Sequence, residues 1–425
     1  MRILYTIGVW LYSLGVRMAA LFGNAKAQLW VEGRKAKVLE PVERPTGQWI
    51  WFHAASLGEF EQGRPVIEAI KKAHPEFKVL LSFFSPSGYE VRKDYPLADE
   101  VLYLPSDTPR HAKAWMQRHH FVAAFFIKYE FWFNYMKALE EAGIPLFYIA
   151  LILKPDSYFF RWYGSWFRKQ LKTVDHFFVQ DETTAECLKQ HGMDNVTVCG
   201  DTRFDRVAAI AEQARPFPEV ERFIKGRKCI IAGSTWPPDE RLWSAVAHRL
   251  PEDYCLVIAP HDVSESHVAQ IKAMFPDSLL YSEWFALCQC HTEAQPSVSI
   301  GREGDCRILI VNTIGILSQL YQYAGFVYIG GGFGVNIHNI QEPVTFGCPV
   351  VFGPKYTSFK EAVDLVALQG AFPIHDAAEL EATVVRLMDD EVFYAQASDT
   401  CRRYLESQVG ATKIIMQGFE KALFS

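Results

Sequence analysis

The segment Trp51–Glu59 carries the clearest candidate for acid–base chemistry. It reads Trp-Phe-His-Ala-Ala-Ser-Leu-Gly-Glu, an apolar run that is expected to pass as a strand into a short turn and then into a helix. Glu59 would lie on the first turn of that helix, where a carboxylate can accept a proton from an attacking hydroxyl. Ser56 and Glu59 also have the spacing of a capping box, in which the Glu side chain binds the backbone of the Ser. Spacing alone leaves both interpretations open and favours the cap.

Two turns in the second half of the chain have the composition of anion-binding loops. Ala232–Thr235 follows one apolar run, and Asn312–Gly315 follows another. Small residues and hydroxyls at such positions let an anion approach free backbone N–H groups. The candidates are Ser234, Thr235 and Gly315. Because many α/β turns without a ligand look the same, these two segments predict a site only in combination with others.

The segment 330–359 is the richest in candidate ligand contacts. Residues 330–334 read Gly-Gly-Gly-Phe-Gly, and this density of glycine predicts backbone packed close to a ligand or to another chain segment. His338, Asn339 and Glu342 follow, and a carboxylate at a helix start could hold a ribose diol. A helix cap is the alternative for Glu342. Neither a G-x-G-x-x-G nor a Walker pattern is present. The combination favours a nucleotide-binding site.

These segments need folded domains to position them, and the sequence predicts two such domains. Short apolar runs alternate with helical patterns, first within residues 49–200 and again within 229–353, which is typical of parallel sheets covered on both faces. The chain becomes linker-like around Arg215–Pro218. We therefore expect two doubly wound, Rossmann-like α/β domains, 34–218 and 219–425, with ligands in the cleft between them. Residues 285–304 are expected to form an exposed loop.

Composition excludes several classes of protein. With 425 residues, of which 49% are apolar, the chain can bury large cores and cannot be disordered as a whole. Its 43 basic and 49 acidic residues give a net charge of −6, which argues against a nucleic-acid partner. The nine cysteines are scattered without a C-x-x-C, which is typical of reduced thiols, so we expect neither disulfides nor a metal site.

Residues 1–33 contain an apolar segment that could contact or cross a membrane. The run Ile3–Val16 carries no charge, Arg17 interrupts it, and the apolar sequence resumes as far as Phe22. This length reaches across a bilayer if the Arg17 side chain extends to the surface. Basic residues such as Lys26 and Arg34 follow closely and would hold that flank in the cytoplasm. We expect an anchor or an interfacial helix, with a core helix and a secretory signal as alternatives.

Taken together, the motifs resemble a known family, the 3-deoxy-D-manno-octulosonic acid (Kdo) transferases of lipopolysaccharide biosynthesis. The resemblance covers nearly the whole chain. Its motifs are Leu29–Arg34, His53–Glu59, Ser85–Gly88, Glu130–Trp132, Gly200–Asp205, Ala232–Thr235, Asn312–Gly315 and Gly330–Phe359.

The resemblance implies an inverting GT-B glycosyltransferase that moves Kdo from CMP-Kdo to a lipid A precursor (lipid IVA) at the cytoplasmic face of the inner membrane. It implies that Glu59 is the catalytic base, with no cofactor and no metal, because helix N-termini could stabilise the departing CMP. The implied acceptor contacts are Gly58, Ser87 and Glu130. The implied donor contacts are Ser234, Thr235, His261, Gly315, Gly331, Gly332, His338, Asn339 and Glu342. The last helix could pack back on the first domain.

Several positions depart from the family pattern, and most lie on the donor side. Lys128 replaces an acidic residue and Phe133 a proline. His261 stands where an Arg is usual, and the remaining departures are Ile316, Ile337 and Ser358. Two other functions therefore stay open. One is a GT-B enzyme of the envelope that uses a UDP-sugar. The other is a non-catalytic, two-lobed sugar-binding protein exported through the N-terminal segment.

Overall fold

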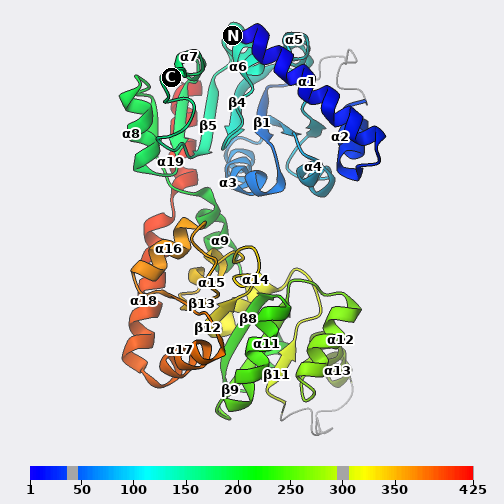
Figure 1. The fold of residues 1–425 in the computed structure, drawn as a ribbon, viewed down its shortest axis with the longest axis vertical. Coiled ribbons are helices and arrows are strands. Elements are labelled where there is room, and N and C mark those ends of the chain that lie inside the picture. The colour runs from blue at the N-terminus through cyan, green and yellow to red at the C-terminus, as the bar shows by residue number, and fades with distance from the viewer. Residues whose placement is uncertain (36–45, 294–305, 425) are drawn as a thin grey trace. The chain divides into compact units, whose positions relative to one another are not determined.

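Two compact units, each built on one parallel β-sheet, make up the chain (Figure 1). The computed structural model describes residues 1–35, 46–293 and 306–424. Met1–Asp205 and Gln408–Ser425 form the first unit, and Arg206–Ser407 form the second.

The boundary differs from the one expected at residue 218, because it falls inside helix α9 (Thr202–Glu212). The start of α9 is tied to the first unit: the Thr202 hydroxyl donates to the Gln62 carbonyl, and Asp205 accepts from the backbone N–H of Gly410 at 2.5 Å. The proline signal marks the first turn of a further helix, α10 (Pro218–Ile224), rather than the junction.

The first unit holds a seven-stranded parallel sheet in the order β3-β2-β1-β4-β5-β6-β7. Its strands are β1 (Trp49–Ala54), β2 (Lys78–Phe83), β3 (Glu100–Tyr103), β4 (Phe121–Ile127), β5 (Leu146–Leu151), β6 (His176–Val179) and β7 (Val196–Val198). Both faces are apolar and buried, as the continuous runs predicted. The order reverses between β1 and β4, which makes that pair the topological switch point where open α/β sheets bind ligands.

Helices cover both faces of this sheet. They are α1 (Arg2–Leu21), α2 (Ala25–Lys35), α3 (Leu57–Ala73), α4 (Pro86–Arg92), α5 (Pro109–Arg118), α6 (Phe133–Ala142), α7 (Ser165–Leu171), α8 (Glu182–Gln190) and α19 (Ala411–Phe424). The C-terminal helix α19 belongs to this unit, where Phe419 packs against Phe77 and Phe125. The segment expected to form one N-terminal helix contains two, because the chain turns at Gly23, which has φ +87°.

The second unit repeats the plan with a parallel sheet ordered β10-β11-β9-β8-β12-β13-β14. Its strands are β8 (Lys228–Thr235), β9 (Tyr254–Pro260), β10 (Leu279–Leu280), β11 (Ile308–Ile310), β12 (Ala324–Ile329), β13 (Val350–Phe352) and β14 (Ala371–Pro373). Here the order reverses between β8 and β12, so their carboxyl ends form the second switch point.

The remaining helices of the second unit are α11 (Pro237–Val246), α12 (Glu265–Met274), α13 (Tyr281–Glu293), α14 (Leu317–Leu320), α15 (Gln341–Thr345), α16 (Lys360–Ala367), α17 (Ala377–Asp389) and α18 (Glu391–Gln408). The loop expected over 285–304 is wrong at its start, because α13 extends to Glu293; residues 294–305 lie outside the described chain. The short strands β10 and β14 were not predicted. The prediction of two doubly wound α/β units is confirmed.

Candidate active site

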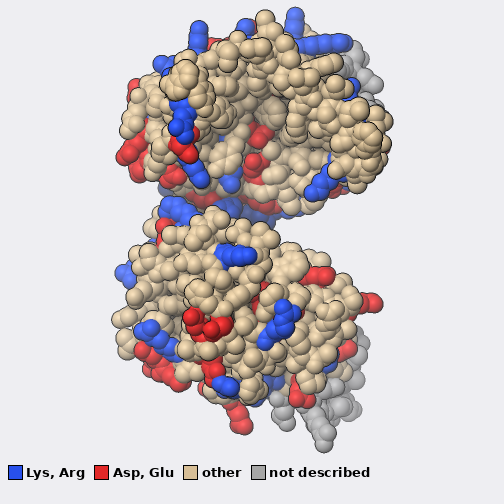
Figure 2. Space-filling view, in the orientation of Figure 1, with Lys and Arg blue, Asp and Glu red and all other residues tan. Residues whose placement is uncertain are grey.

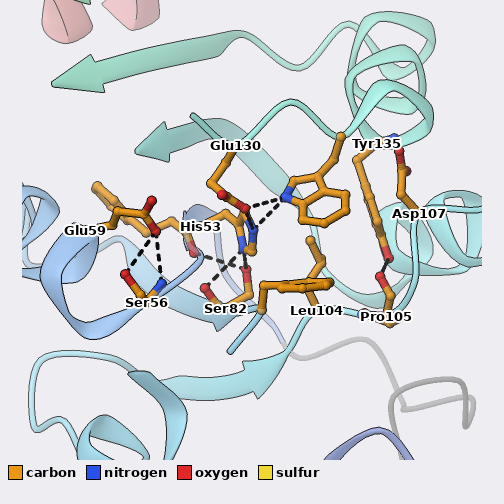
Figure 3. Close-up of polar contacts among 12 residues, drawn as sticks. His53, Ser56, Glu59, Ser82, Leu104, Pro105, Asp107, Glu130 and Tyr135 are labelled. Atoms are coloured by element: carbon orange, nitrogen blue, oxygen red, sulfur yellow. Dashed lines mark hydrogen bonds and ion pairs between the residues drawn. The ribbon is translucent and has the colours of Figure 1, made fainter. Parts of the chain in front are cut away.

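Glu59 lies at the switch point of the first unit, on the first turn of α3, directly after β1 (Figure 3). Its Oε2 accepts a hydrogen bond from the backbone N–H of Ser56 at 2.9 Å and lies 3.4 Å from the Ser56 hydroxyl. The capping interaction anticipated from the spacing is therefore present. Both contacts use Oε2, so they fix the carboxylate and leave Oε1 available to a substrate. The cap and the base are compatible roles for this side chain.

A second carboxylate, Glu130, follows β4 on the other side of the switch point and is part of a buried polar cluster (Figure 3). Glu130 Oε2 lies 3.0 Å from His53 Nε2 and accepts a hydrogen bond from Trp132 Nε1 at 2.7 Å. The other ring nitrogen of His53, Nδ1, lies 2.8 Å from Ser82 Oγ. The Tyr148 hydroxyl donates to the Glu130 backbone carbonyl at 2.7 Å. These bonds hold Glu130 in place at the sheet edge.

The two carboxylates interact electrostatically. Partial burial raises the pKa of Glu59 above its ordinary value, and the negative charge of Glu130 raises it further. The hydrogen bond from Ser56 and the nearby His53 act in the opposite direction and only partly offset this rise. A raised pKa makes the ionised Glu59 a stronger base, which suits proton abstraction near neutral pH.

The predicted acceptor contacts Gly58 and Ser87 also lie at this edge. Gly58 is exposed, and a Cβ built there would meet nothing within 4 Å, so a ligand can approach the backbone beside Glu59. Ser87 lies exposed on the first turn of α4, after β2, and its N–H donates to Ser85 Oγ at 3.3 Å. The first unit thus brings together Glu59, Gly58, Ser87 and Glu130, although Glu130 is almost fully buried. Whether it touches an acceptor stays a prediction.

In the second unit, three aromatic rings cluster at the ends of β8, β9 and β12. The ring of His261 stacks on Trp236, with centroids 4.7 Å apart, and on His338, with centroids 4.4 Å apart. Trp236 Nε1 donates to His338 Nε2 at 2.9 Å. Burial, and secondarily the neighbouring His261, lower the pKa of His338 below its ordinary value, which favours the neutral form of this ring. The three rings form a stacked aromatic cluster.

The glycine-rich loop packs against the chain itself. A Cβ on Gly330 would lie 2.3 Å from the Ser234 carbonyl oxygen, and a Cβ on Gly332 would lie 2.7 Å from the Gly353 backbone. Gly331 has φ +93°, and its N–H donates to the buried Asp239 carboxylate at 3.0 Å. The packing of the glycine cluster against another chain segment, one of the two expected alternatives, is present. The N–H of Gly331 is already used in this structure.

The other predicted donor contacts differ in their solvent exposure and in whether they already have a hydrogen-bond partner. Thr235 is fully buried, and its hydroxyl donates to Glu240 Oε1 at 3.1 Å, which accounts for this side chain without a ligand. Ser234 has φ +54°, a left-handed conformation that is unusual outside glycine. Gly315 is exposed, with open space around it.

Asn339 and Glu342 lie at the start of α15 and bind each other. The Asn339 side-chain amide donates to Glu342 Oε1 at 3.2 Å. Burial raises the pKa of Glu342 above its ordinary value. The second unit therefore brings together the ends of β8, β9 and β12 with this helix start, while Thr235 and Gly331 are committed to internal bonds.

Three residues at these edges were missed as individual candidates from the sequence. His53 and Trp132 bond to Glu130, and Trp236 stacks on His261. Trp236 directly follows β8, His53 is the last residue but one of β1, and Trp132 lies in the loop after β4. Their positions near the carboxyl ends of strands at a switch point were the available signal. Among the described residues, no group of three or more His, Cys, Asp and Glu side chains is placed to hold a metal ion.

Comparisons with known proteins agree with the motifs. Residues 24–206 match the family described as 3-deoxy-D-manno-octulosonic-acid transferase (kdotransferase). Several curated proteins named 3-deoxy-D-manno-octulosonic acid transferase are similar to this chain. The one from Chlamydophila psittaci is 25% identical to it, over 81% of this chain and 78% of that protein. The Aquifex aeolicus protein is 25% identical (80% and 86% covered), and that of Bordetella pertussis is 24% identical (92% and 92% covered).

Solved structures resemble the chain in fold alone. The UDP-GlcNAc 2-epimerase from Neisseria meningitidis bound to UDP-GlcNAc is 13% identical, with a TM-score of 0.59, and the match covers 88% of this chain and all of that one. The UDP-GlcNAc 2-epimerase from Methanocaldococcus jannaschii is 12% identical, with a TM-score of 0.50, and covers 85% of this chain and 100% of its own.

Proposed function

We propose that this chain, which belongs to the 3-deoxy-D-manno-octulosonic acid (Kdo) transferase family, transfers Kdo from CMP-Kdo to a lipid A precursor such as lipid IVA. The observation that carries the proposal is the carboxylate of Glu59. It lies at the switch point of the first unit, one oxygen is fixed by the helix cap, and its pKa is raised by burial and by Glu130.

Glu59 supplies the base for the transfer. Its ionised carboxylate takes the proton from an acceptor sugar hydroxyl as that oxygen attacks the anomeric carbon of Kdo. The bond between the anomeric carbon and the phosphate oxygen breaks on the opposite face, and CMP leaves with the electron pair. The stereochemistry at the anomeric carbon inverts. Glu130 contributes by position and charge, because it keeps the pKa of Glu59 raised.

The ring cluster of the second unit suits the nucleoside of CMP-Kdo. Trp236 is 39% exposed and offers an aromatic surface on which a base can stack. The N-terminus of α11, which follows Trp236, can stabilise the single phosphate of the departing CMP without a metal. Ser234, Gly315 and Asn339 surround this edge with backbone and polar groups. Thr235 and Gly331 would hold the loop rather than the ligand.

Helix α1 supports a proposed position of the enzyme at a membrane surface. Among the described helices, it is the one whose length and composition would let it cross a bilayer. Only 6% of the residues in its most apolar stretch are buried. Polar contacts fix it along the first unit: the Tyr5 hydroxyl donates to Asp107 at 2.6 Å, and Ser13 Oγ lies 2.8 Å from Ser106 Oγ. A helix docked along its length in this way suits an interfacial position on the cytoplasmic face of the inner membrane.

The experiment that tests the proposal incubates the purified full chain with CMP-Kdo and tetraacylated lipid A precursor. We expect CMP release together with a product heavier by a whole number of Kdo units in mass spectrometry. The same assay is run with UDP-sugars in place of CMP-Kdo. Transfer from a UDP-sugar and none from CMP-Kdo would replace the proposal with the UDP-sugar alternative. Absence of transfer from either donor would leave a binding protein.

A further inference from the structure

A cavity of about 730 Å³ opens between α1 and the carboxyl edge of the first sheet. On one side it is lined by a face of α1 that includes Gly8 and Tyr12. On the other side it is lined by aromatic residues from the loops that follow β2, β4 and β5, among them Phe84, Trp132 and Tyr158. We call this space the α1 cleft. Its volume lies within the range of small-molecule sites, and its walls are predominantly apolar.

Polar contacts on either side of the cleft hold α1 in place without filling it. Tyr5 bonds to Asp107 near the start of the helix, and Ser13 bonds to Ser106 two turns later, while Gly8 lies between them. Asp107 is itself satisfied, since it also accepts from the backbone N–H of Asn134 at 3.0 Å. The cleft therefore has an apolar wall and no unpaired charge facing it, which favours an apolar ligand over water or an ion.

One residue of the cleft wall, Trp132, also contacts the acceptor side of the proposed active site. The ring of Trp132 lines the cleft, while its Nε1 donates to the Glu130 carboxylate. One side chain thus joins the apolar space to the edge that carries Glu59. The outer face of α1 is also apolar: Ile3 is 75% exposed and Leu4 is 65% exposed. Figure 2 shows few charged side chains over this helix.

We infer that the α1 cleft binds an acyl chain of the glycolipid acceptor. This inference rests on the proposed function. An acceptor whose chains lie in the membrane beside α1 can place one chain between the helix and the aromatic loops, with its sugar at Glu59. Each methylene that leaves water contributes about fourfold in affinity, so one chain in the cleft gives the enzyme a strong preference for acylated over acyl-free acceptor.

Gly8 and Gly15 offer a matched pair of substitutions. Both are exposed positions of α1, and a Cβ at either meets nothing within 4 Å, so the helix tolerates both changes. Gly8 lines the cleft and Gly15 does not. Gly8→Phe therefore projects a ring into the cleft, Gly8→Ala adds one methyl group, and Gly15→Phe adds the same ring elsewhere on the helix.

The test measures KM and kcat with tetraacylated lipid A precursor in detergent micelles and with its fully deacylated form. We expect Gly8→Phe to raise KM for the acylated acceptor by about tenfold or more, which corresponds to the loss of at least two buried methylenes, with kcat little changed. Gly8→Ala should have a small effect. Gly15→Phe should match the wild type, and KM for the deacylated acceptor should be the same in all four proteins.

The outcomes separate this inference from the function on which it rests. A wild-type chain that transfers Kdo to neither acceptor contradicts the proposed function itself. An active wild type with equal KM for the acylated acceptor in Gly8→Phe and Gly15→Phe overturns the acyl site, and so does a Gly8→Phe that raises KM equally for both acceptors. If Gly8→Phe instead only weakens binding to vesicles of anionic phospholipid, the cleft holds bulk lipid and the inference is wrong.

Discussion

Two acidic residues occupy the same place in the two units and have opposite surroundings. Glu59 and Asp239 are each the third residue of the helix that follows the first strand of a sheet, and each accepts a hydrogen bond, at 2.9 Å, from the backbone N–H of the helix-capping residue. Asp239 is 1% exposed and accepts two further bonds, from the Tyr328 hydroxyl at 2.7 Å and from the Gly331 N–H at 3.0 Å. Glu59 is only partly buried.

Under the proposed function, this difference explains how the same fold provides a catalytic sheet edge in the first unit and a donor-binding sheet edge in the second. The shorter Asp239 is buried and both of its oxygens have partners: Oδ1 accepts from Tyr328 of β12, and Oδ2 accepts from Gly331 of the glycine loop. The longer Glu59 keeps Oε1 available while Oε2 fixes its orientation. Under the proposed function, a side chain one methylene longer, next to the second carboxylate Glu130, lets a capping residue also serve as the base. The four substitutions that follow are arranged to break or sharpen this contrast.

Glu59→Gln is expected to have the largest effect. Glutamine also serves in a capping box, so the helix start and the thermal midpoint should be preserved. Because the amide cannot accept the proton, transfer should fall by about 10²- to 10⁴-fold. The measurement is CMP release together with a melting curve, and CMP affinity should be unchanged. Glu68→Gln, on the same helix, is the control and should keep full activity; a fully active Glu59→Gln leaves Glu59 as a cap alone.

Asp239→Asn should have the opposite pattern to Glu59→Gln: it should lower stability and leave the reaction rate unchanged. Three donors point at this carboxylate, and an amide with one acceptor oxygen leaves at least one of them unpaired in a buried site. The free energy of unfolding should fall by about 1–3 kcal/mol, while kcat at saturating donor stays close to that of the wild type. Chemical denaturation and steady-state kinetics on the same preparation check the two parts. A stable but inactive Asp239→Asn would remove the contrast between the two residues.

Trp236→Leu tests whether the second edge binds by stacking. The substitution removes the indole that lies against His261 and keeps an apolar residue at the start of α11. Stacking on a base is worth about 1–3 kcal/mol, so the affinity for CMP should fall by about fivefold to about hundredfold. Isothermal titration with CMP gives the result. Trp162→Leu, which changes a tryptophan that is 90% exposed in the first unit, is the control; equal affinity in both variants contradicts a stacking role.

Sequence patterns predicted most of the framework and less of the site. The long apolar runs gave both sheets, because parallel strands buried on both faces are apolar throughout. The strands β10 (Leu279–Leu280) and β14 (Ala371–Pro373) escaped because neither contains a β-branched residue, and β14 also contains a proline. The capping box at Ser56 and Glu59 was visible from spacing, since a cap is a local interaction.

The contacts that distinguish the two edges join residues far apart in the chain. His53 meets Glu130, and Asp239 meets Gly331, only after the strands have paired. No local sequence pattern predicts such long-range pairs. The same limit explains why Thr235 and Gly331 had the composition of ligand contacts while the fold commits them to internal bonds. The domain boundary moved for a related reason, because Asp205 contacts Gly410 across half the chain.

The smallest expected effect concerns pH and tests whether Glu130 tunes Glu59. The charge of Glu130 raises the pKa of Glu59, so Glu130→Gln should lower that pKa. A base with a lower pKa stays ionised to lower pH, so the acid limb of the kcat/KM profile should move toward acid. The glutamine can still accept from Trp132, which keeps the loop after β4 in place.

Glu141→Gln is the matched control, because it removes one charge from an exposed position at the far end of α6 and should leave the profile unmoved. If the acid limb moves in both variants, net charge is responsible rather than the neighbouring carboxylate. If it moves in neither, the charge of Glu130 does not raise the pKa of Glu59. The difference between the two edges would then rest on the length of the side chain and not on its charged neighbour.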